Sequence, residues 1–115
     1  MPQDIEPLVQ TTLSDLDTDD CDLLWVFDGI RRQSPGASYW DNRQSTLRVL
    51  AELIGRGLAE AHLLGETFVH ADPSKPVIEQ IDDGWDRYGE DLNMGDVAYF
   101  TITSAGRAEA KPWPA

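Results

Sequence analysis

The chain has 115 residues, of which 41% are hydrophobic, and a formal net charge of −12 at pH 7. Its length fits one domain with a real core, and its hydrophobic fraction argues against general disorder. No apolar run approaches the roughly 20 residues of a membrane span, and the acidic N-terminus shows no secretory signal. The negative charge disfavours nucleic acid as a partner, because polyanions are bound by clustered lysine and arginine.

The acidic residues fall into two blocks. Residues 1–33 hold eight acids and two bases, a net charge of −6, and residues 66–96 hold nine acids and two bases, a net charge of −7. The block from Asp15 to Asp22 is expected to be solvated surface. Cys21 is the only cysteine, which excludes an intrachain disulfide and predicts a reducing, cytoplasmic location.

Apolar spacing predicts two helices in the first third of the chain. The first lies within residues 1–17, and the second runs from about Asp19 to Gln33. The apolar face of the second helix comprises Leu23, Val26, Phe27 and Ile30. Trp25 points away from that face, and we expect it to pack under the N-terminal segment or to anchor a partner.

A third helix is predicted from Asp41 to Ile54, with Asp41 and Gln44 in capping-box spacing. Its expected core stripe is Leu47, Leu50, Ala51 and Ile54, widened by Val49 and Leu53. Residues 58–64 then read as a strand that returns at 68–70 through a turn at Gly65-Glu66.

A fourth helix is expected to begin at Pro76, capped by Ser74. Its apolar stripe is Val77, Ile78, Ile81, Trp85 and Tyr88. Its opposite side is an acidic row of Glu79, Asp82, Asp83, Asp86 and Glu90. A strand at residues 97–102, a short helix capped by Thr103 and a tail at 111–115 complete the chain.

Two stretches resemble winged-helix domains of the MarR-like and PadR-like kind. Residues 46–60 look like the third helix and first wing strand, and residues 99–107 look like the second wing strand with its Thr-x-x-Gly-Arg cap. The match covers about residues 41–65 and 97–110. It implies an α+β fold with helices packed on a small antiparallel sheet, in one domain over residues 1–110. Residues 66–96 would be an insertion carrying the acidic helix.

The residue patterns predict no catalytic, cofactor or metal site. His62 and His70 are the only histidines, and a hairpin that turns at Gly65-Glu66 pairs His62 with Val69 and points the two imidazoles to opposite faces. A shifted turn would bring them together, which leaves a zinc site as the minor alternative. No metal-binding motif, phosphate-cradling loop or nucleophile motif is present. We therefore expect a protein that is not an enzyme.

Charge and aromatic residues then suggest a protein-binding module. The acidic row and Trp40 are the predicted partner-binding residues, and the expected partner is a basic protein, as for an adaptor or an immunity-type protein. Trp40 could equally pack at the start of a helix, and the outward aromatics could form a homodimer seam. The alternative function is a DNA-binding transcriptional regulator that uses Arg43, Arg48 and Arg56.

Overall fold

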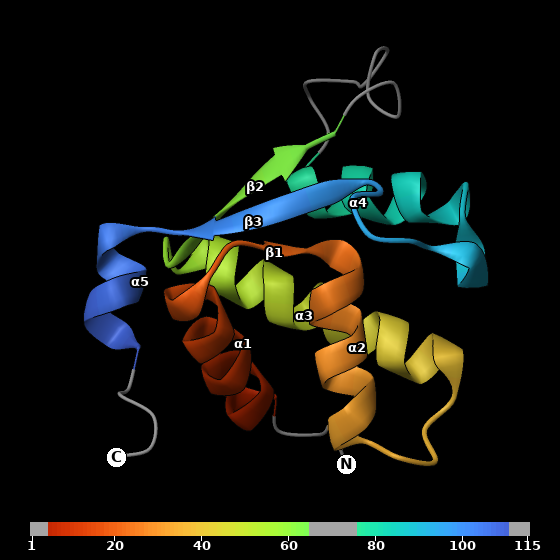
Figure 1. The fold of residues 1–115 in the computed structure, drawn as a ribbon, viewed down its shortest axis with the longest axis horizontal. Coiled ribbons are helices and arrows are strands. Elements are labelled where there is room, and N and C mark those ends of the chain that lie inside the picture. Colours follow the sequence, from red (N-terminus) through yellow and green to blue (C-terminus); the bar gives the residue numbers. More distant parts are fainter. Residues whose placement is uncertain (1–4, 65–75, 111–115) are drawn as a thin grey trace.

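The computed structural model describes residues 5–64 and 76–110. Short strands are interspersed among the helices along the chain (Figure 1). In chain order the elements are α1 (Glu6–Thr18), β1 (Cys21–Asp22), α2 (Leu23–Gln33), α3 (Tyr39–Gly55), β2 (Ala59–Leu63), α4 (Val77–Asp86), the 3-10 helix η2 (Gly89–Asp91), β3 (Ala98–Ile102) and α5 (Ser104–Glu109).

The described strands form a three-stranded antiparallel sheet in the order β1-β3-β2. The pairing Ala61↔Phe100 places the two side chains on the same face. Phe100 is fully buried, so this face lies on the core. The opposite face carries the neighbouring pair His62↔Tyr99. Figure 1 shows α1, α2 and α3 together on one side of the sheet.

Three helices begin at a polar side chain that accepts a hydrogen bond from the first turn. Asp22 accepts from the Trp25 backbone N–H, Ser38 from that of Asp41, and Thr103 from that of Gly106. The predicted cap of α5 is therefore confirmed. The second helix was predicted to start at about Asp19 and instead begins at Leu23. The third helix was predicted to start near Asp41 and begins slightly earlier, at Tyr39. Residues 21–22 pair with β3 as a strand before α2, and the earlier cap Ser38 lets α3 begin at Tyr39.

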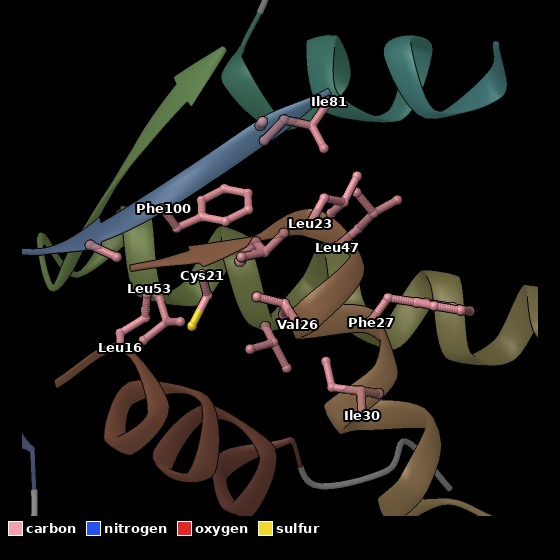
Figure 2. Close-up of a cluster of buried hydrophobic side chains, with 14 of the residues drawn as sticks. Leu16, Cys21, Leu23, Val26, Phe27, Ile30, Leu47, Leu53, Ile81 and Phe100 are labelled. Atoms are coloured by element: carbon pink, nitrogen blue, oxygen red, sulfur yellow. The ribbon is translucent and has the colours of Figure 1, made fainter. Parts of the chain in front are cut away.

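The hydrophobic core lies between the sheet and the helices (Figure 2). The predicted apolar face of α2 is confirmed, since Leu23, Val26, Phe27 and Ile30 are all buried. On α3 the buried apolar side chains are Leu47, Val49, Leu50 and Leu53. Ala51, predicted in the core stripe, is exposed, because α3 turns that position away from the sheet.

Helix α4 lies against α3 at the end of the molecule away from α5 (Figure 1). Four members of its predicted apolar stripe are confirmed: Ile81 and Trp85 are fully buried, and Val77 and Ile78 pack against the core. Tyr88 also packs against the core, but it lies beyond the end of α4 at Asp86. The helix begins at Val77 with Pro76 as its cap residue. Ser74, the return at 68–70 and the tail at 111–115 lie outside the described residues.

The expected α+β class is thus confirmed, as helices packed on a three-stranded antiparallel sheet. Within the described ranges, no helix is long and apolar enough to cross a membrane.

Candidate functional site

A buried guanidinium joins α3 to α4. Arg43 comes from the first turns of α3, and its side chain is 2% exposed. Its Nη2 donates hydrogen bonds to Asp82 Oδ1 at 2.8 Å, to Asp86 Oδ1 at 2.7 Å and to the Asp82 carbonyl at 3.0 Å. Asp82 and Asp86 share one side of α4 because they are four residues apart. One cation thus binds both carboxylates.

Aromatic rings surround the same guanidinium. Its Cζ lies 4.8 Å from the ring centroid of Trp85 and 5.3 Å from that of Trp40, within cation–π range. Tyr39 meets Trp40 edge to face at 5.2 Å. Trp85 is fully buried, whereas Trp40 is 61% exposed. The exposed indole of Trp40 is therefore held by neighbours on α3, beside two carboxylates of α4.

The charge of Arg43 is maintained despite its burial. Burial by itself would lower the pKa of Arg43, but hydrogen bonds with Asp82, Tyr39 and Asp86 outweigh it and raise the pKa above its ordinary value. The guanidinium is a permanent cation at every physiological pH. Its two carboxylates keep 44% and 65% of their side-chain surface exposed, so the cluster is open to solvent on the acidic side.

The five predicted acidic residues do not behave alike. Asp82 and Asp86 neutralise Arg43, and Asp83 also takes part in an interaction. Glu79 and Glu90 are exposed. Sequence reasoning missed the pairing because Arg43 and α4 are about forty residues apart, although Arg43 and Leu47 are four residues apart and share a helix face.

No protein-family model, curated protein or solved structure matches the chain.

The three arginines of the DNA-binding alternative have different environments. Arg43 is buried at the α3–α4 junction. Arg56 binds the carboxylates of Glu6 and Glu52, and these contacts raise its pKa. Arg48 is exposed, and its side chain makes no hydrogen bond or ion pair with the described residues. Of the three arginines predicted to contact DNA phosphates, Arg48 is therefore the one whose guanidinium is not already paired with a carboxylate.

His62 lies on the outer face of the sheet. Its ring stacks on Tyr99 at 4.6 Å, and its Nε2 lies 2.9 Å from Thr101 Oγ1. Its cross-strand neighbour in the described sheet is Tyr99. The predicted partner Val69, like His70, lies outside the described residues. Among the described side chains, no group of three or more His, Cys, Asp or Glu is arranged to hold a metal ion.

Cys21 does not present a nucleophile at neutral pH. It is 4% exposed, and burial together with the negative charges of Asp15 and Asp19 raises its pKa to about 12. The thiol therefore stays protonated.

Two further apolar side chains are exposed away from the α3–α4 junction. Trp25 is 54% exposed and Met94 is 78% exposed. The expectation that Trp25 packs under the N-terminal segment is wrong, because more than half of the side chain is exposed. Its alternative role as an anchor for a partner stays a prediction. Met94 was missed by sequence reasoning, because a methionine in a loop carries no periodic signal; only its neighbours in the fold place it beside Trp25.

Proposed function

We propose that this protein is a non-catalytic binding module whose acidic surface engages a basic partner protein. The observation that carries the proposal is Trp40, an exposed indole held in place by Tyr39 and Arg43 beside the carboxylates of Asp82 and Asp86. Tryptophan is frequent among the residues that dominate binding energy, and an anchor that is already ordered loses little entropy on binding.

The net charge of −12 supports the choice of a basic partner. Complementary charge accelerates encounter and selects against acidic partners. Glu79 on α4 and Glu90, which lies in η2 and not on α4 as predicted, are exposed and add to the negative surface. Adaptors and immunity-type proteins that bind a toxin or a nucleic-acid-binding protein fit this description, and the cytoplasm is the proposed location.

We also propose that the scaffold is a winged-helix domain with an inserted helix. Its support is the passage from the long α3 into β2, the antiparallel pairing of β2 with β3, and the Thr103 cap that follows β3. In such a domain α3 would face the major groove. Arg43 is buried between α3 and α4 and cannot contact DNA, which weakens the DNA-binding alternative. That alternative depends on Arg48.

The test begins with the full-length chain on a solid support in nuclease-treated lysate at low salt. A stoichiometric basic protein that is released by rising salt would identify the partner. Trp40→Ser and the pair Glu79→Lys/Glu90→Lys should each weaken its binding about tenfold. These variants keep the ion pairs of Arg43 with Asp82 and Asp86, although Trp40→Ser removes one of the two aromatic rings beside the guanidinium. Reversing the charge of Asp82 or Asp86 would break those ion pairs.

The matched control is Glu60→Lys/Glu109→Lys, which changes charge equally at exposed positions on β2 and α5. Equal weakening by both pairs would show only long-range attraction and would count against this site. Retention of defined DNA fragments from untreated lysate, lost with Arg48→Glu, would instead support the transcriptional regulator.

A further inference from the structure

A groove of about 490 Å³ lies where α1 ends, β1 begins and the loop before β3 approaches α2. Three of its lining side chains are large and apolar or aromatic: Trp25 from α2, Met94 from the loop and Tyr99 from β3. The lining is completed by Asp15, Thr18, Asp19, Asp20, Cys21 and Asp22. The groove therefore has an apolar part and an acidic rim.

Trp25 and Met94 of the groove are exposed, whereas most large hydrophobic side chains of the described residues are buried. In the described ranges, the exposed large hydrophobic residues are Trp25, Trp40 and Met94, and two of them line this groove. Solvent-exposed apolar side chains that gather in a hollow mark interaction sites more often than isolated ones do. Methionine also adapts its shape to different partners.

The backbone segments that carry Trp25 and Met94 are tied together before any partner arrives. The carboxylate of Asp22 accepts hydrogen bonds from the Trp25 backbone N–H at 2.8 Å and from the Gly95 backbone N–H at 2.7 Å. One side chain therefore ties the start of α2 to the loop that carries Met94. Binding to such a surface loses less conformational entropy than binding to a loose one.

The charges around the groove define its occupant. Four aspartates line it, and no lysine or arginine does so among the described residues. An incoming segment must therefore offer positive charge, and the exposed indole and thioether require an apolar side chain to cover them.

We propose that this groove docks a short segment of a partner protein in which an apolar side chain is flanked by lysine or arginine. The chemistry of the partner rests on the proposed function, but the residues that bind it are different from those of the α3–α4 junction. Trp25 and Met94 cover the apolar side chain, and Asp19 and Asp20 attract its basic neighbours.

The probe is a short synthetic peptide in which leucine and phenylalanine alternate with lysine. A second peptide has the same charge, with serine in place of the apolar residues. We expect the first peptide to bind more tightly and to shift the Trp25 indole N–H and Met94 methyl resonances of the full chain. Trp25→Ser should weaken its binding about tenfold, which corresponds to about 1.4 kcal/mol.

Met94→Ser provides a second variant at a highly exposed position of the groove. Trp40→Ser reports separately whether the peptide binds at the α3–α4 junction. Asp19→Asn/Asp20→Asn should weaken binding more than the equal charge change Glu60→Gln/Glu109→Gln. Thermal unfolding of each variant checks that the fold is kept.

Three results would overturn the proposal. If Trp40→Ser weakens binding and Trp25→Ser does not, the groove is excluded and the proposed function stands. If both peptides bind equally and neither Trp25→Ser nor Trp40→Ser changes the affinity, neither tryptophan anchors the peptide. This result would contradict both this proposal and the proposed function. If sedimentation without peptide shows a dimer that Trp25→Ser abolishes, the groove is occupied by a second copy of the chain.

Discussion

At the scale of single residues, Gly106 explains why the Thr-x-x-Gly sequence follows β3. Thr103 caps α5 and also donates from its hydroxyl to the Gly57 carbonyl at 2.6 Å. This contact draws α5 onto the chain between α3 and β2. A Cβ atom at Gly106 would lie 2.1 Å from the Leu58 carbonyl oxygen and 2.7 Å from Ile102 Cγ1. Only glycine fits there without movement of the backbone.

Gly106→Ala is therefore expected to lower the free energy of unfolding by about 2–3 kcal/mol, as for overpacking against an immovable group. Urea denaturation followed by circular dichroism measures the change. The control is Gly55→Ala at the end of α3, where an added Cβ meets nothing within 4 Å. That change should be neutral or stabilising by up to about 1 kcal/mol. Equal loss in both variants would contradict the explanation.

The buried thiol of Cys21 is expected to make the free energy of unfolding depend on pH. Burial raises the pKa of its thiol to about 12 from an unfolded value near 9. The unfolded chain therefore loses this proton at a lower pH than the folded chain. The contribution of the buried thiol to the free energy of unfolding is fully present below pH 9 and is lost as the pH rises toward 12.

Cys21→Ala should flatten this part of the curve. The quantity to compare is the difference in unfolding free energy between wild type and variant across pH 8 to 11, by urea denaturation, since tyrosine and lysine titration is common to both. A difference that does not change with pH would contradict the expected shift.

At the scale of elements, α4 is tied to α3 by one asymmetric cluster. Arg43 is 2% exposed, whereas Asp82 and Asp86 are 44% and 65% exposed. Water can therefore solvate the carboxylates if the cation is removed, but it cannot reach the cation if the carboxylates are neutralised.

Asp82→Asn/Asp86→Asn should consequently be more destabilising than Arg43→Met. We expect losses of about 3–5 kcal/mol for the first, the range for an unpaired buried charge, and about 1–3 kcal/mol for the second. Chemical denaturation of the full chain measures both, with Glu79→Gln/Glu90→Gln as the exposed control. The reverse order would show that the guanidinium does not need the two negative charges, since the Asp82 carbonyl and the aromatic rings remain in place.

A γ-turn with positive φ leads into β3. Val97 has φ +70°, and the Ala98 backbone N–H donates to the Asp96 carbonyl at 2.8 Å. Such turns are rare, and a β-branched residue is strained in them. Val97 is 1% exposed, so burial of its side chain maintains this conformation next to the loop that carries Met94.

At the scale of the whole molecule, the net charge of −12 opposes the compact state through self-repulsion. Raising NaCl from about 10 mM to about 150 mM shortens the Debye length from about 30 Å to about 8 Å. We expect Tm to rise over this range, measured by scanning calorimetry. Glu60→Gln/Glu109→Gln, which is less acidic, should show a smaller rise. A falling Tm would mean that ion pairs such as those of Arg56 outweigh the repulsion.

The periodic elements were determined by the sequence itself. Residue spacing predicts the apolar faces of α2 and α4. The cap of α5 depends on a hydrogen bond between one side chain and the backbone three residues later, so both features can be predicted from short stretches of sequence. The α+β class was predicted correctly for the same reason. The winged-helix identity, the acidic partner surface and the DNA-binding alternative stay predictions.

Tertiary structure alone decided which charges meet and which apolar groups stay in water. The pairing of Arg43 with Asp82 and Asp86 and the hollow shared by Trp25 and Met94 join segments far apart in the chain. The exposure of Ala51 depends on which side of α3 faces the core. Even the start of α2 depended on β3, because residues 21–22 pair with it. Such contacts carry no signal in residue spacing, since they arise only when separate elements pack.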